Sequence, residues 1–408
     1  MPDLIFAYRD ASQAAGRGPL SELEILIQPN LAARGWECGA GSVALEKFVP
    51  LQDAAAVEKL KAAGAKLAGS IRMAELGLGL DGDRMADALS QSLGHAAVMT
   101  DLMGEARCAA VASQCYGFKP SYGLISRFGF NGLIPSMECL GVAARSLDTI
   151  TTILAVLAGP DERDPSMRRD AALDFTQAKK KPDKPIKAGV IRESLRGLSP
   201  DEAKCFEQAL TWLGKMNIHV TSIGLPEYEL FRVAHQAVGS VEASSHAGKY
   251  DGVRYGHRTA NAENWNEMYL RSRAESFGLL IKSYLFQGAY FQFQNYPAFD
   301  NACRIRGRLL QQAQALFENV DVLISPLRSP ASDASGDSSL DKLYDRFEPA
   351  LPANLLGFPA LAVPGSLFDP DMSLGLQWMG PPLADVRLLA AARHLVNAAS
   401  GKGTNDAE

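Results

Sequence analysis

The alternation of apolar and polar positions along the chain predicts strands and helices in turn. Short β-branched or apolar runs, bounded by polar or glycine-containing segments, indicate buried strands. We expect such strands at residues 24–27, 188–191, 219–223, 320–325, 360–364 and 375–379. Apolar positions spaced near 3.6 residues predict helices at residues 53–66, 86–97, 147–157, 201–216 and 384–399. Strands that alternate with helices indicate an α/β fold, with a mixed central β-sheet covered by helices on both faces.

A lysine-rich run at residues 179–185 (K-K-K-P-D-K-P) marks the best internal boundary. No aromatic residue interrupts it, so we interpret it as a solvated linker rather than a nucleic-acid surface. The polar run A-S-D-A-S-G-D-S-S-L at residues 331–340 predicts a surface loop. The chain then divides into an N-terminal part at 1–178, a linker at 179–187, a second part at 188–400 and a flexible tail at 401–408.

Composition is that of an ordinary globular protein. The chain has 408 residues, of which 47% are hydrophobic and 21% charged, and its formal net charge is −5. This balance, without a basic stripe, argues against direct nucleic-acid contact. The first residues lack the pattern of a signal peptide, and no uncharged apolar run reaches membrane-spanning length. We therefore expect a cytoplasmic protein without membrane contact.

Cysteine and histidine positions do not predict a metal site. The six cysteines contain no C-x-x-C pair, and scattered single cysteines fit a reducing compartment. The six histidines are isolated from one another, which favours structural or surface roles over metal ligation. We expect no metal and no cofactor.

The most informative segment reads T-D-L-M-G-E-A-R at residues 100–107, followed by Y-G-F-K-P-S-Y-G at 116–123. It resembles the central segment of the amidase signature family, T-D-T-G-G-S-I-R and then G-x-K-P-T-Y-G. Glu105 stands where the family has its nucleophilic serine, and a carboxylate cannot be activated for acyl transfer as a serine hydroxyl can. The positions that match are Thr100, Asp101, Gly104, Arg107, Lys119, Pro120, Tyr122 and Gly123.

Four further blocks extend the resemblance from about residue 20 to about residue 398. They are G-P-D-E-R-D at 159–164, D-G-V-R-Y-G-H-R-T-A-N-A-E-N at 251–264, P-A-N-L-L-G-F-P-A-L-A-V-P at 352–364 and L-G-L-Q-W-M-G at 374–380. Within the family they are most similar to the A subunits of glutamyl-tRNA(Gln) amidotransferases. The resemblance implies the amidase-signature fold.

The resemblance also implies a Ser–cis-Ser–Lys catalytic arrangement, in which the backbone N–H groups of a glycine-rich turn stabilise the oxyanion. At the three catalytic positions this chain has Gln28, Asp81 and Glu105, and the segment between the first two is shorter than in the family. Leu102 and Met103 replace small residues of the turn, which we expect to crowd the oxyanion site. We therefore expect no hydrolysis by this mechanism.

Several side chains are candidates for a replacement role. Glu105 and Asp81 could form a carboxyl pair for acid–base chemistry, or Glu105 could pair with a neighbouring arginine or simply fill the site. Cys108 has no nearby histidine and is interpreted as a buried structural thiol. Ser70, in a second G-S-I-R run, is interpreted as a coincidence. The candidate pocket comprises Asp101, Met103, Gly104, Glu105, Arg107 and Cys108.

Asp251, Arg254 and Arg258 fall in the block where an arginine of the related subunit holds the substrate carboxylate. Two interpretations stay open, namely retained binding of a carboxylate ligand and retained folding contacts. The family's aspartate for the substrate amino group falls near Phe347, beside Glu348, which argues against unchanged glutamine binding.

Three functions follow as hypotheses. The first is a catalytically degenerate pseudoamidase, acting as a structural or regulatory subunit of a larger complex with protein partners. The second is a small-molecule enzyme that uses Glu105 and Asp81 as acid–base groups on an amide- or carboxylate-bearing ligand. The third is an ancillary member of a tRNA-dependent amidotransferase-like complex.

Overall fold

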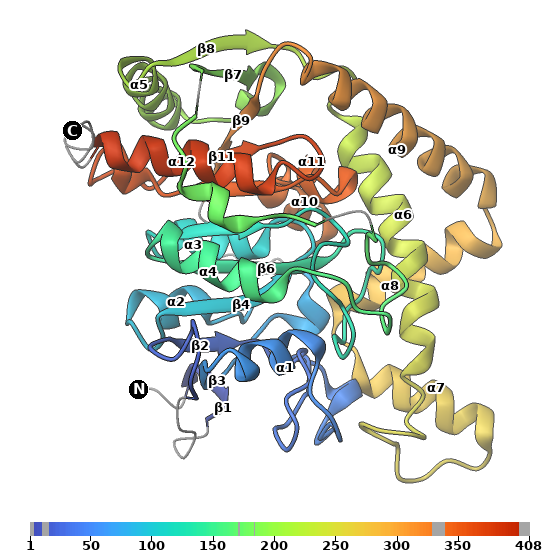
Figure 1. Ribbon diagram of the computed structural model, residues 1–408. Helices are drawn as coiled ribbons and strands as arrows, with labels where there is room; N and C mark the ends of the chain where they lie inside the picture. The colour runs from blue at the N-terminus through green and yellow to red at the C-terminus, as the bar shows by residue number, and fades with distance from the viewer. Residues whose placement is uncertain (1–3, 10–15, 170–171, 183, 329–338, 400–408) are drawn as a thin grey trace.

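The computed structural model describes residues 4–9, 16–169, 172–182, 184–328 and 339–399, and one mixed β-sheet of eleven strands runs through this part of the chain. The strands are β1 (Phe6–Tyr8), β2 (Glu24–Ile27), β3 (Lys66–Ile71), β4 (Ala96–Asp101), β5 (Tyr116–Lys119), β6 (Cys139–Ala144), β7 (Ile186–Ile191), β8 (Ile218–Ile223), β9 (Val322–Leu327), β10 (Ala360–Val363) and β11 (Gly375–Met379). Their order is β1-β3-β2-β4-β6-β5-β10-β11-β9-β7-β8 (Figure 1). Parallel pairs join β2 to β3 and β4, and β7 to β8 and β9, while the remaining pairs are antiparallel.

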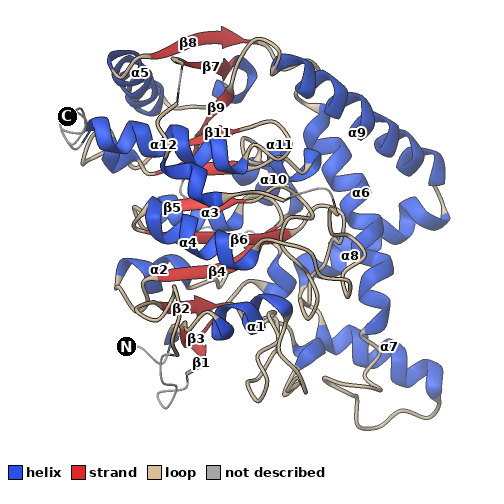
Figure 2. Cartoon of the chain, viewed as in Figure 1, coloured by secondary structure: helices blue, strands red, loops and turns tan. Residues whose placement is uncertain are grey.

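Helices cover both faces of this sheet (Figure 2). Along β10, Leu361 and Val363 pack in one hydrophobic cluster, whereas Ala360 and Ala362 pack in another on the opposite face. Since side chains alternate between the faces of a strand, two helical layers bury the sheet from both sides. The α-helices are α1 (Ala55–Ala62), α2 (Met85–Ser90), α3 (Glu105–Ala112), α4 (Leu147–Leu157), α5 (Pro200–Lys215), α6 (Leu230–His246), α7 (Trp265–Ser276), α8 (Leu279–Phe293), α9 (Tyr296–Leu316), α10 (Leu340–Phe347), α11 (Leu351–Leu356) and α12 (Asp385–Ala399). The predicted fold class is confirmed.

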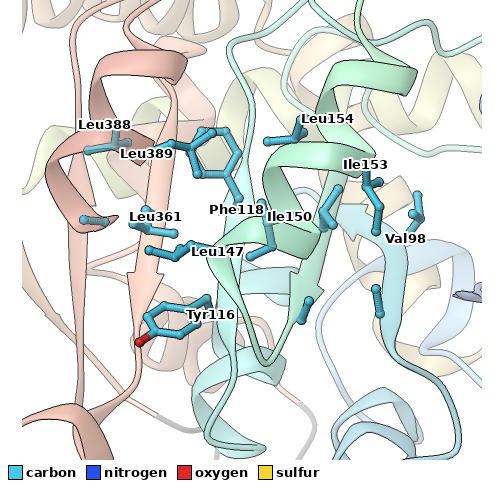
Figure 3. Close-up of a cluster of buried hydrophobic side chains, with 14 of the residues drawn as sticks. Val98, Tyr116, Phe118, Leu147, Ile150, Ile153, Leu154, Leu361, Leu388 and Leu389 are labelled. Atoms are coloured by element: carbon cyan, nitrogen blue, oxygen red, sulfur yellow. The ribbon is translucent and has the colours of Figure 1, made fainter. Parts of the chain in front are cut away.

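One of the two layers is built around α4. Its N-cap Ser146 accepts a hydrogen bond from the N–H of Thr149, and the apolar positions that follow form one face of the helix. Figure 3 shows that face packed between side chains of β4, β5, β10 and α12, with Ile150 beside Phe118.

Trimming Ile150 to valine tests how tightly this layer is packed. Ile150 is fully buried, so Ile150→Val should lower the free energy of unfolding by about 1 kcal/mol, through lost transfer energy and a small cavity. Chemical denaturation measures the loss, with Ala155→Ser on the exposed side of α4 as a near-neutral control. Equal stability of the Ile150→Val protein and the wild type would contradict close packing here.

Most predicted elements lie where the pattern placed them, with two corrections. The helix predicted at 53–66 ends at Ala62, because Gly64 adopts a positive φ of 91° and the chain then turns directly into β3. The helix predicted at 86–97 stops at Ser90, because Ala96 onward pairs with β2 and β6. Of the loop predicted at 331–340, residues 331–338 lie outside the described residues, and Leu340 begins α10. The tail predicted at 401–408 also lies outside the described residues.

The lysine-rich run is followed directly by β7, which joins the common sheet through parallel pairing with β9. The division of the chain at this run stays a prediction. Among the described residues no helix is both long and apolar enough to cross a membrane.

Candidate functional site

Glu105 is the first residue of α3, directly after the turn that follows β4. The turn depends on Gly104, whose φ is 129° and where an added Cβ would lie 2.5 Å from the Cβ of Ala350. A larger residue would therefore be strained and would collide with the residue that precedes α11. The same tight turn directs consecutive N–H groups toward one point.

The Glu105 carboxyl group occupies that point. Its Oε2 accepts hydrogen bonds from the N–H groups of Leu102 (2.7 Å), Met103 (2.7 Å) and Gly104 (3.1 Å). Its Oε1 accepts a fourth from the N–H of Gly79 (3.0 Å). Free N–H groups and the dipole at a helix N-terminus favour an anion, and here the chain supplies the acceptor itself.

Burial and charge act on this carboxyl in opposing ways. Glu105 is only 1% exposed. Burial, followed by the nearby charge of Asp101, raises the pKa of Glu105 to about 7, while the backbone N–H donors act to lower it. Leu102 and Met103 are expected to crowd the oxyanion site. In the structure the N–H groups of these two residues donate to the Glu105 carboxyl, so they are not free to bind an oxyanion.

A buried ion pair fixes the other side of α3. Arg107 donates from Nε to Asp101 Oδ2 (3.0 Å) and from Nη2 to Asp101 Oδ1 (2.8 Å), with both side chains fully buried. Arg107 also donates to the carbonyl of Ala350 (3.1 Å) and to the side-chain oxygens of Asn354 and Gln377. Arg107 is therefore not the arginine partner considered for Glu105, because its carboxylate partner is Asp101.

Gln28 contacts a different aspartate from the one that the spacing indicated. Its Oε1 accepts from the N–H of Thr100 (2.8 Å), and its Nε2 donates to Asp83 Oδ2 (2.8 Å). Burial raises the pKa of Asp83 to about 7. Asp81 is exposed instead and forms an ion pair with Arg346 (2.9 Å). The first alternative, a Glu105–Asp81 pair, is therefore not formed, because Asp83 points to Gln28 while Asp81 is exposed and contacts Arg346.

His235 makes a hydrogen bond to the backbone of the turn. Its Nε2 lies 3.2 Å from the carbonyl oxygen of Leu102, which can only accept, so the proton is on Nε2. Nδ1 then accepts from the hydroxyl of Tyr344 (2.9 Å), and Tyr284 Oη lies 3.1 Å from Tyr344 Oη. Burial lowers the pKa of His235 to about 4, so the ring is neutral near pH 7. No local pattern predicts this network, since its three members lie far apart along the chain.

The side chains of the remaining candidates take no part in the hydrogen bonds described so far. Cys108 is buried and burial raises the pKa of its thiol, as the interpretation of a structural thiol requires. Ser70 is a buried residue of β3. Asp251 accepts from the N–H of Val253 (2.9 Å), Arg254 donates to the carbonyl of Lys249 (3.2 Å), and Arg258 is exposed. These contacts of Asp251 and Arg254 lie within their own segment of the chain.

A cleft of about 840 Å³ opens beside the segment that carries Gly79. Leu78 and Asp81, which lie on either side of Gly79 in the chain, line this cleft, while Glu105 is buried and accepts a hydrogen bond from the N–H of Gly79. In the part of the chain that the structure describes, no three histidine, cysteine or acidic side chains gather as metal ligands. The other residues of the cleft include Glu75, Gln236, Leu279, Gln287, Leu340 and Asp341.

The similarity between this chain and several known proteins extends over nearly the whole chain. The A subunit of the glutamyl-tRNA(Gln) amidotransferase of Thermus thermophilus is 34% identical over 399 residues, which cover 92% of this chain and 84% of that protein. Among solved structures, the corresponding A subunit from Thermotoga maritima superposes with a TM-score of 0.80 at 22% identity, covering 97% of this chain and 88% of that one. A solved structure of a vestigial protein complex, described as revealing the evolutionary origins of an s-triazine catabolic enzyme, contains a chain that superposes with a TM-score of 0.80 at 20% identity. The superposition covers 98% of this chain and 92% of that one.

These relatives correct the first functional hypothesis. A degenerate pseudoamidase that acts as a structural or regulatory subunit is the wrong interpretation, because the A subunits of known amidotransferases match most of the chain at about 30% identity. Similarity spread over this length favours the alternative of an amidotransferase-like subunit over a degenerate enzyme. A family model described as Amidase matches residues 6–87 and 85–389, and the chain therefore belongs to the amidase family.

Proposed function

We propose that this chain is the member of a tRNA-dependent amidotransferase-like complex that corresponds to the A subunit. The observation that carries the proposal is the 34% identity to a known A subunit, spread over 92% of this chain. The coverage of 84% of that relative leaves little of it without a counterpart here. A protein named as a subunit works with partners, so the proposal includes at least one different protein chain.

Within this proposal, the described side chains define what chemistry the chain can contribute. Asp83 and Glu105 each have a carboxyl group whose pKa burial raises to about 7. Such groups can accept or donate a proton near neutral pH, which suits reactions of amides and carboxylates. Gln28 holds Asp83 and the N–H of Thr100 together, so it positions one of the two carboxyls. The cleft beside Gly79 is the place we assign to an amide- or carboxylate-bearing substrate.

Purification of the tagged chain from its native cells tests the proposal. We expect a second protein to co-purify in a fixed ratio, identified by mass spectrometry. The purified complex should then convert glutamyl-tRNA(Gln) to glutaminyl-tRNA(Gln), with ATP and either glutamine or ammonium as nitrogen source. A lone chain that yields no product with either nitrogen source would refute the proposal.

Asp83→Asn is the matched site variant for that assay. Asp83 contacts Gln28 and the N–H of Met85 (2.7 Å) and keeps part of its surface exposed, so asparagine is expected to preserve folding and partner binding. If Asp83 transfers protons, the variant complex assembles but loses turnover and its dependence on pH near 7. Full turnover in this variant would remove Asp83 from the reaction.

A further inference from the structure

A series of hydrogen bonds leads from three helices to the turn that holds Glu105. Tyr284 of α8 has its hydroxyl oxygen 3.1 Å from that of Tyr344 in α10. The Tyr344 hydroxyl lies 2.9 Å from Nδ1 of His235 in α6, and Nε2 of the same ring lies 3.2 Å from the carbonyl oxygen of Leu102. The three side chains, here called the relay, are fully buried, and α8 contacts both α6 and α10 (Figure 1).

The direction of donation along the relay is fixed. The carbonyl oxygen of Leu102 can only accept, so the His235 proton is on Nε2 and Nδ1 has to accept. The hydroxyl of Tyr344 then donates to Nδ1, and since this hydroxyl has only one proton, its oxygen accepts from Tyr284. Every donor in the relay thus points toward the turn. Hydrogen bonds aligned head to tail in this way strengthen one another, by roughly 10–30% for each bond.

A single peptide group connects the relay to the carboxyl of Glu105. The carbonyl of Leu102 and the N–H of Met103 belong to the same amide, and this N–H donates to Glu105 Oε2 (2.7 Å). Resonance couples the two ends of an amide, so a hydrogen bond accepted at the oxygen makes the N–H a stronger donor. The hydrogen bond from His235 to Leu102 therefore strengthens the one that Met103 makes to the carboxylate.

The relay acts as a set of dipoles rather than as a set of charges. Burial lowers the pKa of His235 to about 4, so the ring is already neutral where Glu105 titrates, near 7. The charged group that raises the pKa of Glu105 is Asp101, which is paired with Arg107. Burial raises the pKa values of the other titratable groups that face Glu105, so they are uncharged near pH 7; they are Cys108 of α3, Tyr284 of α8 and Tyr344 of α10.

Two arginines face the relay itself. Arg306 acts on His235, and the guanidinium carbon of Arg232 lies 5.7 Å from the ring centre of Tyr344. An arginine stays charged over the whole range in which a carboxyl group titrates. The two arginines therefore make a constant contribution, and the hydrogen bonds of the relay remain as the part that a substitution can change one bond at a time.

We propose that His235 is a positioning residue for Glu105, which holds the amide between Leu102 and Met103 against the carboxylate and so stabilises its ionised, proton-accepting form. The inference rests on the proposed function, in which Glu105 exchanges a proton near neutral pH. Tyr344 and Tyr284 contribute in descending order, because each lies one hydrogen bond further from the carboxyl. This order is the signature of a polarised series of bonds.

Titration of Glu105 in the purified full-length chain tests the proposal. Carbon NMR of a chain made with isotope-labelled glutamate follows the side-chain carboxyl groups, and the Glu105 signal is the one that disappears in Glu105→Gln. His235→Leu should raise the pKa of Glu105 by about half a unit, which is about a three-fold rise in proton affinity. Tyr344→Phe should raise this pKa less, and Tyr284→Phe least. Each tyrosine variant removes one oxygen atom, so the order can be measured even if His235→Leu does not fold.

Two further variants separate this role from simple packing. Tyr116→Phe is the matched control, because Tyr116 is buried in the hydrophobic cluster on the other face of the sheet from Leu102 and Met103, and the pKa of Glu105 should stay unchanged. His235→Gln keeps an N–H donor for the Leu102 carbonyl and should bring the pKa back toward the wild-type value. An unchanged pKa in His235→Leu and Tyr344→Phe would overturn the proposal, and so would an equal shift in Tyr116→Phe.

The titration needs neither substrate nor partner, so its result is separate from the test of the proposed function. A complex that makes no glutaminyl-tRNA(Gln) would refute the function and leave the measured pKa values as they are. In an active complex, the pH profile of turnover should shift in Tyr344→Phe in the same direction as the pKa of Glu105. An active complex whose Glu105 titrates identically in all variants would remove the positioning role alone.

Discussion

Glu105→Ala is expected to lower the free energy of unfolding by roughly 3 kcal/mol, since it leaves the N–H groups of four buried residues without their acceptor. Each unsatisfied buried donor costs about 1–3 kcal/mol, and water entering the vacated space offsets part of the sum. Urea denaturation measures the loss, with Glu46→Ala at an exposed position as the control. Wild-type stability in the variant would show that the four contacts contribute nothing net.

A small carboxylate should restore part of that stability. Formate or acetate can occupy the N–H groups that Glu105 leaves free, and a ligand that binds only the folded state raises its stability in proportion to the logarithm of its concentration. The rescue should occur in the Glu105→Ala protein and not in the wild type, with chloride at equal ionic strength as the reference. No difference between formate and chloride would contradict an anion site at this turn.

The pH dependence of the same pair of proteins has a definite sign. The folded-state pKa of Glu105 is raised to about 7 from its ordinary value of 4.5, so the folded state holds a proton that the unfolded state has already released. Stability from this proton is fully present below pH 4.5 and is lost as the pH rises through 7, with a slope of up to about 1.4 kcal/mol per pH unit. The stability difference between the wild type and Glu105→Ala should therefore shrink from pH 5 to pH 8.

Arg107→Met is expected to cost about 3–5 kcal/mol, the largest effect of any single change proposed for this chain. It leaves the fully buried carboxylate of Asp101 without its cation, and it removes the donors that reach Ala350 and Asn354. Burial by itself would raise the pKa of Asp101, and the charge of Arg107 overcomes this and holds that pKa below its usual value.

A double-mutant cycle separates the ion pair from simple loss of packing. Asp101→Asn removes the stranded charge, so the protein with both Asp101→Asn and Arg107→Met should recover part of the stability lost in Arg107→Met alone. Thermal unfolding of the four proteins gives the coupling energy directly. Additive losses would mean that the two charges do not stabilise one another.

The sequence predicted the strands of the second half of the chain more readily than β4, β5 and β6. β10 and β11 stand between glycine and proline residues that mark their ends, so their limits are visible in the pattern. β4, β5 and β6 are buried along their full length, so they lack the polar alternation that sets a strand apart from a helix. Their place was decided by pairing with strands far away in the chain, which local patterns do not contain.

The sequence identified Glu105, the central residue of the candidate site, but it did not predict the hydrogen bonds that this residue makes. Glu105 was found because it interrupts a recognisable motif. Its acceptor role depends on the backbone of Gly79, and every residue type except proline carries the same N–H there. Counting along the chain selected Asp81, but the turn directs Asp83 to Gln28. Spacing identifies positions only when the intervening loop keeps its length.

The strand order has a consequence for synthesis of the chain on the ribosome. β5 pairs with β6 on one side and with β10 on the other, where Lys119 lies opposite Ala360. When the first six strands have emerged, the outer edge of β5 still lacks its partner, and it keeps lacking it until the residues near 360 leave the exit tunnel. An unpaired edge on a strand that is buried in the finished protein invites pairing with other chains. The nascent protein should therefore depend on chaperones until its synthesis is nearly complete, and truncation before β10 should give aggregation rather than a smaller folded core.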